Sequence, residues 1–324
     1  MSRSLAPKAR DTRSLPQTSD DVFPAQPSLL LFGATSTVGA RLLPLLRERA
    51  LAVAACSRGP LTPWQQQHPE VLWIQTALAA APAIADGTTH IVSLGPCDLF
   101  VDWLARQTPA PSLRQIIAFG STSADTKIDS SSGDERALAQ SLQRSQQRLA
   151  VESQRLGATW TLLRPTLIYG GSDDLVARIG RIAARWHVYP RPLGLVGQAR
   201  RQPVHAADLA AAVFHAIDNP AAFNRRFDLA GQESLSLAEL IRRSAKAATP
   251  LACPLPVPLS LLLRLAESIG VTPGKSGLGR SAATRLGRDQ LFDIAAAHTA
   301  LGYAPRAFTP EKPTRKSGVR AVDE

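Results

Sequence analysis

Residues 28–46 read Ser28-Leu-Leu-Leu-Phe-Gly-Ala-Thr-Ser-Thr-Val-Gly-Ala-Arg-Leu-Leu-Pro-Leu-Leu46. The order of residue types predicts a short buried strand at 29–32, then a glycine turn, then an apolar helix. Gly33 allows a sharp turn, and the N–H groups of residues 36–38 lie at the start of the helix, where its dipole adds positive potential. Gly39 has no side chain where helix and strand must touch. Proteins hold the pyrophosphate of a dinucleotide in this context, although a tight turn without a ligand has the same outline.

The composition is that of a globular protein with an excess of positive charge. The chain has 324 residues, of which 44% are hydrophobic, so it can bury a sizeable core. No apolar run reaches the roughly 20 residues of a membrane-spanning helix. The net charge of +11 suits nucleic acid, an anionic membrane surface or an anionic small molecule. Basic residues are scattered or gathered in both terminal segments without interleaved aromatic residues, which argues against nucleic-acid binding.

Cysteines and histidines argue against two kinds of site. Cys56, Cys97 and Cys253 are widely spaced and odd in number, which excludes a disulfide framework and fits a reducing compartment. None of the six histidines has the spacing to cysteines or carboxylates that a metal site requires. The first 26 residues lack the apolar core of a secretory signal. We therefore expect a cytoplasmic protein without a metal ion.

The rest of the chain determines the expected domain organisation. Strand-like and helix-like stretches alternate as far as Tyr169, which predicts an α/β fold with a Rossmann-like, doubly wound parallel sheet. Residues 1–26 are expected to be a disordered leader. The segments that follow are a Rossmann dinucleotide-binding domain at 27–170, a smaller and mainly helical C-terminal substrate lobe at 171–310 (of which about 199–230 rejoin the Rossmann domain), and a disordered basic tail at 311–324.

Two of the expected helices have an unusual distribution of charged and apolar residues. In the helix at about 135–156, Glu152 lies on the apolar face, and we expect it to pair with Arg148 one turn earlier. A second stretch, 258–266, is strongly apolar but too short to span a membrane. It is expected to be a buried or partner-facing helix, with a surface anchor as the alternative.

Five stretches, of which the first belongs to the segment quoted above, share their pattern with one superfamily. They are Gly33-Ala-Thr-Ser-Thr-Val-Gly39, Leu162-Leu-Arg-Pro-Thr-Leu-Ile-Tyr-Gly170, Pro203-Val-His-Ala-Ala-Asp-Leu-Ala210, Phe227-Asp-Leu-Ala-Gly231 and Leu301-Gly-Tyr-Ala-Pro-Arg306. Together they resemble the motifs of extended and atypical short-chain dehydrogenases/reductases, which include NAD-dependent epimerases and dehydratases. The resemblance covers residues 27–310 and implies a Rossmann-like fold. It also implies a substrate that is a nucleotide sugar or a similar small carbonyl or hydroxyl compound.

The end of the second predicted strand bears on the choice of dinucleotide. Members of this superfamily usually have an acidic residue there that binds the ribose 2′-hydroxyl, whereas this chain has Cys56-Ser57-Arg58. A guanidinium pairs with a 2′-phosphate, so Arg58 favours NADP over NAD, unless it is a solvated loop residue. In the first turn Ser36 replaces the middle glycine and leaves the phosphates less room. The residues expected to contact the cofactor are Gly33, Thr35, Ser36, Thr37, Val38, Gly39, Ser57, Arg58, Leu94 and Gly95.

The catalytic pair implied by the resemblance is missing. Active members use a tyrosine and a lysine four residues later, which lowers the tyrosine pKa from its ordinary value of about 10. The chain has only Tyr169, Tyr189 and Tyr303, and no Tyr-x-x-x-Lys occurs in it. The superfamily's hydroxyl at the end of the fifth strand is retained as Thr122. Lys127 in the next loop is the candidate acid/base if burial lowers its pKa, and a solvated lysine is the alternative.

Two other motif positions have both a functional and a structural interpretation. Arg200 and Arg201 precede the Pro203 motif, where they hold an anionic substrate or lie exposed to solvent. His205 is expected to support the start of the helix that contains Asp208 rather than to transfer protons.

Two classes of function therefore remain open. One is an NAD(P)-dependent oxidoreductase or epimerase/dehydratase-like enzyme with a non-standard acid/base set, in which Thr122 contacts the substrate oxygen and Lys127 supplies the proton. The other is a catalytically silent NAD(P)-binding accessory or regulatory module, which would resemble the dehydrogenase-like accessory subunit of respiratory complex I. Its basic surface and the 258–266 segment would then be docking features. A homodimer or a partner subunit fits either class.

Overall fold

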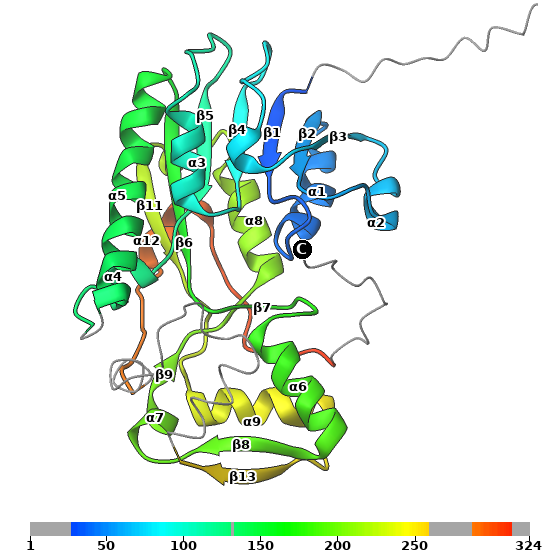
Figure 1. Cartoon of the computed structure of the whole chain (residues 1–324), viewed down its shortest axis with the longest axis vertical. Helices are drawn as coiled ribbons and strands as arrows, with labels where there is room; N and C mark the ends of the chain where they lie inside the picture. The colour runs from blue at the N-terminus through cyan, green and yellow to red at the C-terminus, as the bar shows by residue number, and fades with distance from the viewer. Residues whose placement is uncertain (1–26, 131–132, 259–286, 313–324) are drawn as a thin grey trace, which may run out of the picture.

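The computed structural model of the chain describes residues 27–130, 133–258 and 287–312 (Figure 1). Three segments with a predicted structure lie wholly or mostly outside these ranges: 1–26, 258–266 and 311–324. The described residues form a larger part built around one sheet and a smaller part beyond its carboxyl edge.

Seven parallel strands form the central sheet, in the order β11-β6-β5-β4-β1-β2-β3 (Figure 1). Their bounds are β1 Leu29–Phe32, β2 Val53–Ser57, β3 Val71–Gln75, β4 His90–Ser93, β5 Gln115–Phe119, β6 Thr159–Pro165 and β11 Arg225–Leu229. The helices around it are α1 Gly39–Glu48, α2 Pro63–Gln66, α3 Cys97–Leu104, α4 Ser123–Thr126, α5 Gly133–Arg155, α8 Ala206–Ala216 and α12 Ala295–Leu301, with 3-10 turns at Leu78–Ala80 and Pro220–Ala222.

Both faces of the sheet are covered, because side chains alternate along each strand and both sets are apolar. In β1, Leu29 and Leu31 pack in the core formed with α1, α8 and α12. Leu30 and Phe32 pack in a second core formed with α3 and α5. The predicted fold class is confirmed: the chain is an α/β protein with a Rossmann-like parallel sheet.

The strand order reverses at β1. The chain runs from β1 to β2 and β3 on one side of the sheet and then crosses to β4 and β5 on the other. Phe32 at the end of β1 consequently lies beside Cys56 of β2 and Ser93 of β4. Open parallel sheets bind ligands beyond the carboxyl ends of the strands at such a reversal. The predicted glycine turn follows Phe32 directly and lies at this point.

The smaller part combines two helices with a two-stranded ribbon (Figure 1). Its elements, and the short strands that lead to them, are β7 Ile168–Tyr169, α6 Leu175–Trp186, β8 Val188–Pro192, α7 Leu195–Gln198, β9 Arg200–Arg201, β10 Val204–His205, β12 Leu235–Ser236, α9 Leu237–Ala248 and β13 Cys253–Val257. Helices α6 and α9 pack against each other, and α9 packs on β8. Tyr189 of β8, Leu240 of α9 and Val257 of β13 share the core there. The parallel ribbon of β8 and β13 was not predicted from the sequence.

The predicted ion pair within α5 is wrong. Arg148 binds Asp102 of α3, with 2.7 Å between nitrogen and oxygen. Glu152 instead accepts a hydrogen bond from Arg155, at 2.8 Å. Because α3 lies alongside α5, it offers Arg148 a carboxylate on a neighbouring element. Arg155 also donates to the Leu104 carbonyl at the end of α3, at 2.8 Å, so the pairing joins the two helices.

Candidate functional site

The glycine turn between β1 and α1 leaves no room for side chains at its two ends. Gly33 has a φ of +83°, a conformation that favours glycine. A Cβ placed on it would lie 3.1 Å from the Cβ of Leu94, just past β4. A Cβ on Gly39 would lie 2.3 Å from the Gly33 carbonyl oxygen and 2.6 Å from that of Ala34. These glycines therefore allow strand, turn and helix to touch.

The turn leaves two backbone amides at the start of α1 without an acceptor. The Ser36 N–H donates to the Gly33 carbonyl at 3.0 Å, and the Ser36 hydroxyl oxygen accepts from the Gly39 N–H at 3.0 Å. The amides of Thr37 and Val38 donate no hydrogen bond to any described residue. The structure thus differs from the sequence expectation at Ser36, whose amide closes the turn itself. Thr37 and Val38 supply the N–H groups available to a phosphate, at the positive end of a ten-residue helix.

The other residues expected at the cofactor lie on neighbouring strand ends. Ser57 is buried at the end of β2, and Arg58 follows it with an exposed side chain. The Leu94 N–H donates to the Phe32 carbonyl at 3.0 Å, which extends the pairing of β4 with β1 by one residue. Gly95 follows in the loop before α3. The strand register therefore places these residues side by side with the turn at one edge of the sheet.

Two cysteines near this edge, Cys56 and Cys97, are buried. Burial raises the pKa of Cys56 to about 11 and that of Cys97 to about 12, so both thiols are protonated near neutral pH. Among the described residues, no group of three or more His, Cys, Asp or Glu could hold a metal ion.

Thr122 and Lys127 flank the one-turn helix α4, beyond the carboxyl end of β5. Thr122 is buried, and its hydroxyl donates to the Pro165 carbonyl of β6 at 3.3 Å. Lys127 ends α4 and is half-buried. From α5, the Gln146 side chain donates to the Ser121 carbonyl at 3.1 Å. Because the Thr122 proton is already used, its oxygen is available to another group as an acceptor, or as a donor only after rotation.

Arg164 holds this loop in place, a role that the sequence did not reveal. It is 3% exposed, near the end of β6. Its guanidinium donates to both carboxylate oxygens of Asp228 on β11, at 2.6 and 2.9 Å, and to Asp125 of α4 at 2.7 Å. Burial lowers the pKa of Arg164, but the hydrogen bonds and charges of Asp228 and then Asp125 outweigh it and raise the pKa. A buried arginine in a strand was a usable signal, since such a charge requires a carboxylate partner.

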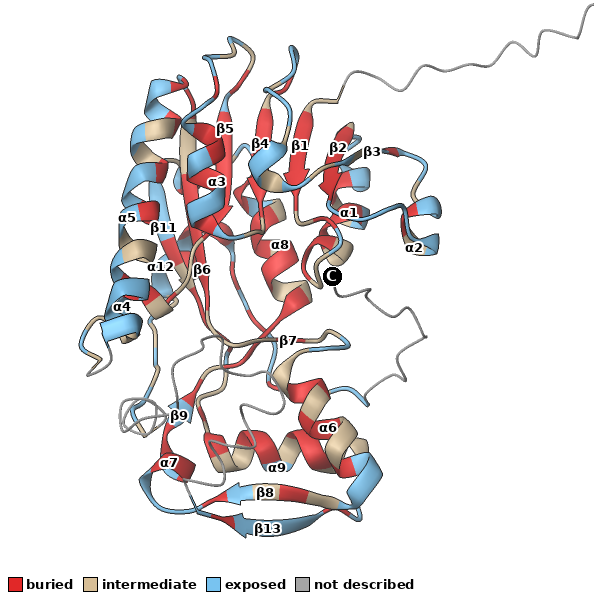
Figure 2. Ribbon diagram, viewed as in Figure 1, coloured by how far each residue is buried: buried red, intermediate tan, exposed pale blue. Residues whose placement is uncertain are grey.

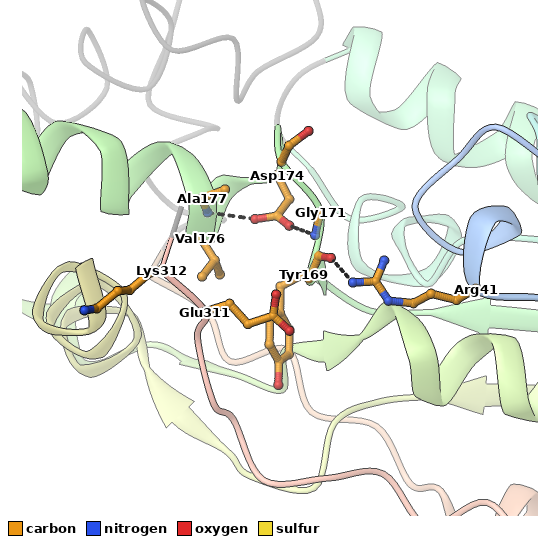
Figure 3. Close-up of a pocket in the computed structure, with 10 residues that line it drawn as sticks. Arg41, Tyr169, Gly171, Asp174, Val176, Ala177, Glu311 and Lys312 are labelled. Carbon is orange, nitrogen blue, oxygen red and sulfur yellow. Dashed lines mark hydrogen bonds between the residues drawn. The ribbon is translucent and has the colours of Figure 1, made fainter. Parts of the chain in front are cut away.

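A cavity of about 200 Å³ adjoins the glycine turn (Figure 3). Arg41 of α1 lies on one side and donates to the carbonyl oxygens of Thr37 (3.1 Å) and Gly170. Asp174, at the start of α6, accepts from the Gly171 N–H at 2.7 Å. A Cβ on Gly171 would lie 2.4 Å from the Thr37 hydroxyl, so the cavity wall touches the turn. Arg41 is a residue that the sequence analysis missed, although it stands four residues after Thr37, in the first turn of α1.

His205 has the structural role expected from the sequence. Its Nδ1 accepts a hydrogen bond from the Ala207 N–H at 3.2 Å and so caps α8. Its Nε2 lies 3.5 Å from the Glu311 carboxylate at the cavity. Burial, followed by the positive charges of Arg306 and Arg41, lowers the pKa of His205 from its ordinary 6.5.

The lowered pKa of His205 predicts a pH-dependent stability. The unfolded chain gains this proton at a higher pH than the folded chain does. The contribution of neutral His205 to the free energy of unfolding is therefore fully present above about pH 6.5, and it is lost as pH falls toward the folded-state pKa. We expect His205→Asn, which keeps a cap for Ala207 but does not titrate, to lose less stability than wild type between about pH 7 and about pH 5. Denaturant unfolding at both pH values measures this, and an identical loss in the two proteins would contradict it.

Arg201, Tyr169 and Tyr303 make structural contacts. Arg201 is 7% exposed and donates to the carbonyls of Arg200 (2.8 Å) and Arg288 (2.7 Å), so its guanidinium holds backbone in place. The Tyr303 hydroxyl donates to the Ala230 carbonyl at 3.0 Å, and that of Tyr169 accepts from the backbone at 3.3 Å. Burial raises the pKa of both tyrosines. Neither has the lowered pKa of a catalytic tyrosine.

Comparison of the sequence with known proteins finds one short match. No protein-family model matches the chain. A Dictyostelium discoideum protein, NADH dehydrogenase (ubiquinone) 1 alpha subcomplex subunit 9, mitochondrial, is 26% identical over 81 residues, which are 25% of this chain and 22% of that protein. The chain therefore matches less than a quarter of that subunit's length.

Solved structures match over nearly the whole chain at low identity. The UDP-glucose 4-epimerase of Thermotoga maritima, with UDP-glucose, is 13% identical with a TM-score of 0.62, covering 86% of this chain and 94% of that one. The UDP-glucuronic acid 4-epimerase of Bacillus cereus, in complex with UDP-glucuronic acid and NAD, is 14% identical with a TM-score of 0.61 and the same coverage. The resemblance inferred from the motifs is thus confirmed at the level of the fold, and the chain has the fold of the NAD-dependent nucleotide-sugar epimerases.

Proposed function

We propose that the chain binds a nicotinamide dinucleotide, with its pyrophosphate on the amides of Thr37 and Val38. The observation that carries the proposal is the turn itself. Gly39 has no room for a Cβ, and those two amides have no acceptor among the described residues at the N-terminus of α1. Gly33, Thr35 and Ser36 complete the turn, while Ser57, Leu94 and Gly95 lie along the dinucleotide. When bound, the cofactor supplies hydride transfer, and the chain supplies orientation.

We further propose that NADP is preferred over NAD. Arg58 is exposed immediately beyond β2, and Cys56-Ser57-Arg58 contains no carboxylate to repel a 2′-phosphate. The Bacillus cereus epimerase carries NAD, so in this proposal the chain differs from that epimerase in its preferred dinucleotide. Arg58→Ala is expected to weaken NADPH binding about tenfold, or ~1.4 kcal/mol, and to leave NADH binding unchanged. Calorimetric titration measures both, with Arg226→Ala on the opposite sheet edge as the control; equal losses for both dinucleotides would contradict the assignment.

The proposed activity is oxidoreductase or epimerase/dehydratase-like chemistry on a nucleotide sugar. The epimerases with this fold bind UDP-glucose and UDP-glucuronic acid. In the proposal, the Thr122 oxygen contacts the substrate hydroxyl, and Lys127 in the same loop holds the proton that the missing tyrosine would carry. Arg164 fixes the position of the loop by its hydrogen bond to Asp125.

Turnover of UDP-glucose and UDP-glucuronic acid with NADP tests the activity. Thr122→Ala and Lys127→Ala are each expected to lower turnover by about a hundredfold or more with NADPH affinity unchanged. Thr122→Ser, which keeps the hydroxyl, is the matched control and should retain most activity. Unchanged turnover in both alanine variants would contradict the assigned acid/base set.

A catalytically silent NAD(P)-binding module is the second candidate. It is favoured by the absence of Tyr-x-x-x-Lys from the whole sequence and by the Thr122 hydroxyl, which already donates to Pro165. The Dictyostelium protein is named as an NADH dehydrogenase subunit. Tight NADPH binding without turnover of any nucleotide sugar would support this candidate over the enzyme.

A further inference from the structure

Exposed apolar side chains gather at one end of the molecule. Five of the eleven large ones exposed in the described part of the chain lie there: Trp186 (64%), Leu193 (50%), Leu195 (76%), Leu251 (73%) and Leu255 (53%). We call these five residues the apolar tip. They lie at the end of α6, around the ribbon of β8 and β13, and at the start of α7, the end farthest from the central sheet (Figure 2).

The ribbon register shows where the members of the tip lie along the ribbon. Cys253 pairs with Val188. Leu251 and Trp186 each stand two residues before this pair and so lie at the same end of the ribbon. Leu193 follows the other end of β8, a five-residue strand of about 16 Å. Exposed apolar side chains therefore lie at both ends of the ribbon.

Cations without a carboxylate partner lie beside the tip. Residues 175–200 contain five arginines and no aspartate or glutamate, and two of the five, Arg178 and Arg181, pair with Asp173 at the start of α6. The Arg185 guanidinium lies 5.2 Å from the ring centre of Trp186, and Arg191 is exposed within β8. Lys246 donates to the Pro250 carbonyl, next to the tip, at 2.6 Å. None of these three cations forms an ion pair with a carboxylate in the part of the chain that the structure describes.

This combination fits a lipid surface better than the other partners. Tryptophan and leucine enter the headgroup region of a bilayer, while arginine and lysine meet its phosphates. A two-fold contact between two tips would gather the cations of both copies in one interface, where like charges repel. A nucleic acid would leave the four leucines without partners, since its bases need aromatic stacking. No helix among the described residues is long and apolar enough to cross a membrane.

We propose that the apolar tip docks on the surface of an anionic lipid bilayer, with Arg185, Arg191 and Lys246 against the lipid phosphates. The proposal goes beyond the proposed function and does not depend on dinucleotide binding. It gives these three cations a partner of opposite charge.

Vesicle flotation of the full-length protein tests the docking. Phosphatidylcholine vesicles with phosphatidylglycerol should bind the protein in a salt-sensitive way, and vesicles of phosphatidylcholine alone should bind far less. The double variants Trp186→Ser/Leu195→Ser and Arg185→Glu/Arg191→Glu should each lower the partition coefficient at least about fivefold. A blue shift of tryptophan fluorescence on adding the anionic vesicles should be absent in Trp186→Phe.

Two matched variants away from the tip serve as controls. Val151→Ser removes an apolar side chain that is 63% exposed on α5, and Arg226→Glu reverses an exposed charge on β11. Both should bind vesicles like wild type, and thermal unfolding checks that every variant folds. The proposal is overturned by absent binding, by equal binding to neutral vesicles, or by equal losses in the controls. It is also overturned if tip variants change only the oligomeric state in size-exclusion chromatography, which would assign the tip to a second copy.

Discussion

Gly39→Ala should weaken NADPH binding at least about tenfold and lower the free energy of unfolding by about 1–3 kcal/mol. The added methyl group would lie 2.3 Å from the Gly33 carbonyl oxygen, which is backbone and cannot rotate away. The helix must therefore move from the strand, and the amides of Thr37 and Val38 move with it. Calorimetric titration with NADPH and denaturant unfolding measure the two effects.

Gly133→Ala is the matched control for this change. Gly133 begins α5, and a Cβ placed on it would meet nothing within 4 Å. Stability and NADPH affinity should both stay near wild type or improve slightly, because alanine favours a helix. If Gly39→Ala were as harmless as Gly133→Ala, the close approach of α1 to the turn would be unimportant for binding.

Arg164→Met should lower the free energy of unfolding by about 3 kcal/mol. The substitution removes a buried guanidinium and leaves Asp228, which is 21% exposed, without its bidentate partner. It also releases Asp125 and with it helix α4, so any turnover that depends on Thr122 should fall further than stability alone explains. Denaturant unfolding gives the first effect, and kcat at a temperature where the variant is folded gives the second.

Arg242→Met is the matched control for Arg164→Met, because it removes an exposed bidentate ion pair and not a buried one. Arg242 also donates to both oxygens of one carboxylate, that of Glu239, at 2.7 Å each, but its side chain is 50% exposed. A pair of this kind contributes at most about 1 kcal/mol, because water solvates both partners when the pair is broken. Equal losses for Arg164→Met and Arg242→Met would mean that the buried pairing has no special role.

Local sequence pattern was sufficient to predict the central sheet. Strands such as β1 and β5 are short apolar runs followed by turn residues, and both of their faces are buried, so each run was recognisable by itself. The ribbon of β8 and β13 had no such signal. Val188–Pro192 and Cys253–Val257 each contain two prolines, which normally argue against a strand. Each of the two strands has one partner strand among the described residues, so prolines are tolerated on the side that faces away from the partner. Only the tertiary arrangement reveals this.

In the candidate site, too, some features depend on residues near in sequence and others on residues far apart. The glycine turn depends on neighbours in sequence, so its geometry could be expected from Gly33 and Gly39. Arg164 was visible in its motif, but its partner Asp228 is 64 residues away and lies beside it only because β11 pairs with β6. The internal use of the Ser36 amide could not be expected either, since it depends on the conformation of the turn.

The central claim is that the turn between β1 and α1 holds a nicotinamide dinucleotide, and calorimetric titration of the wild-type protein with NADPH and, separately, NADH tests it most directly. The account predicts saturable binding of NADPH, at least about tenfold tighter than that of NADH. Binding of neither dinucleotide to the folded protein would contradict the claim.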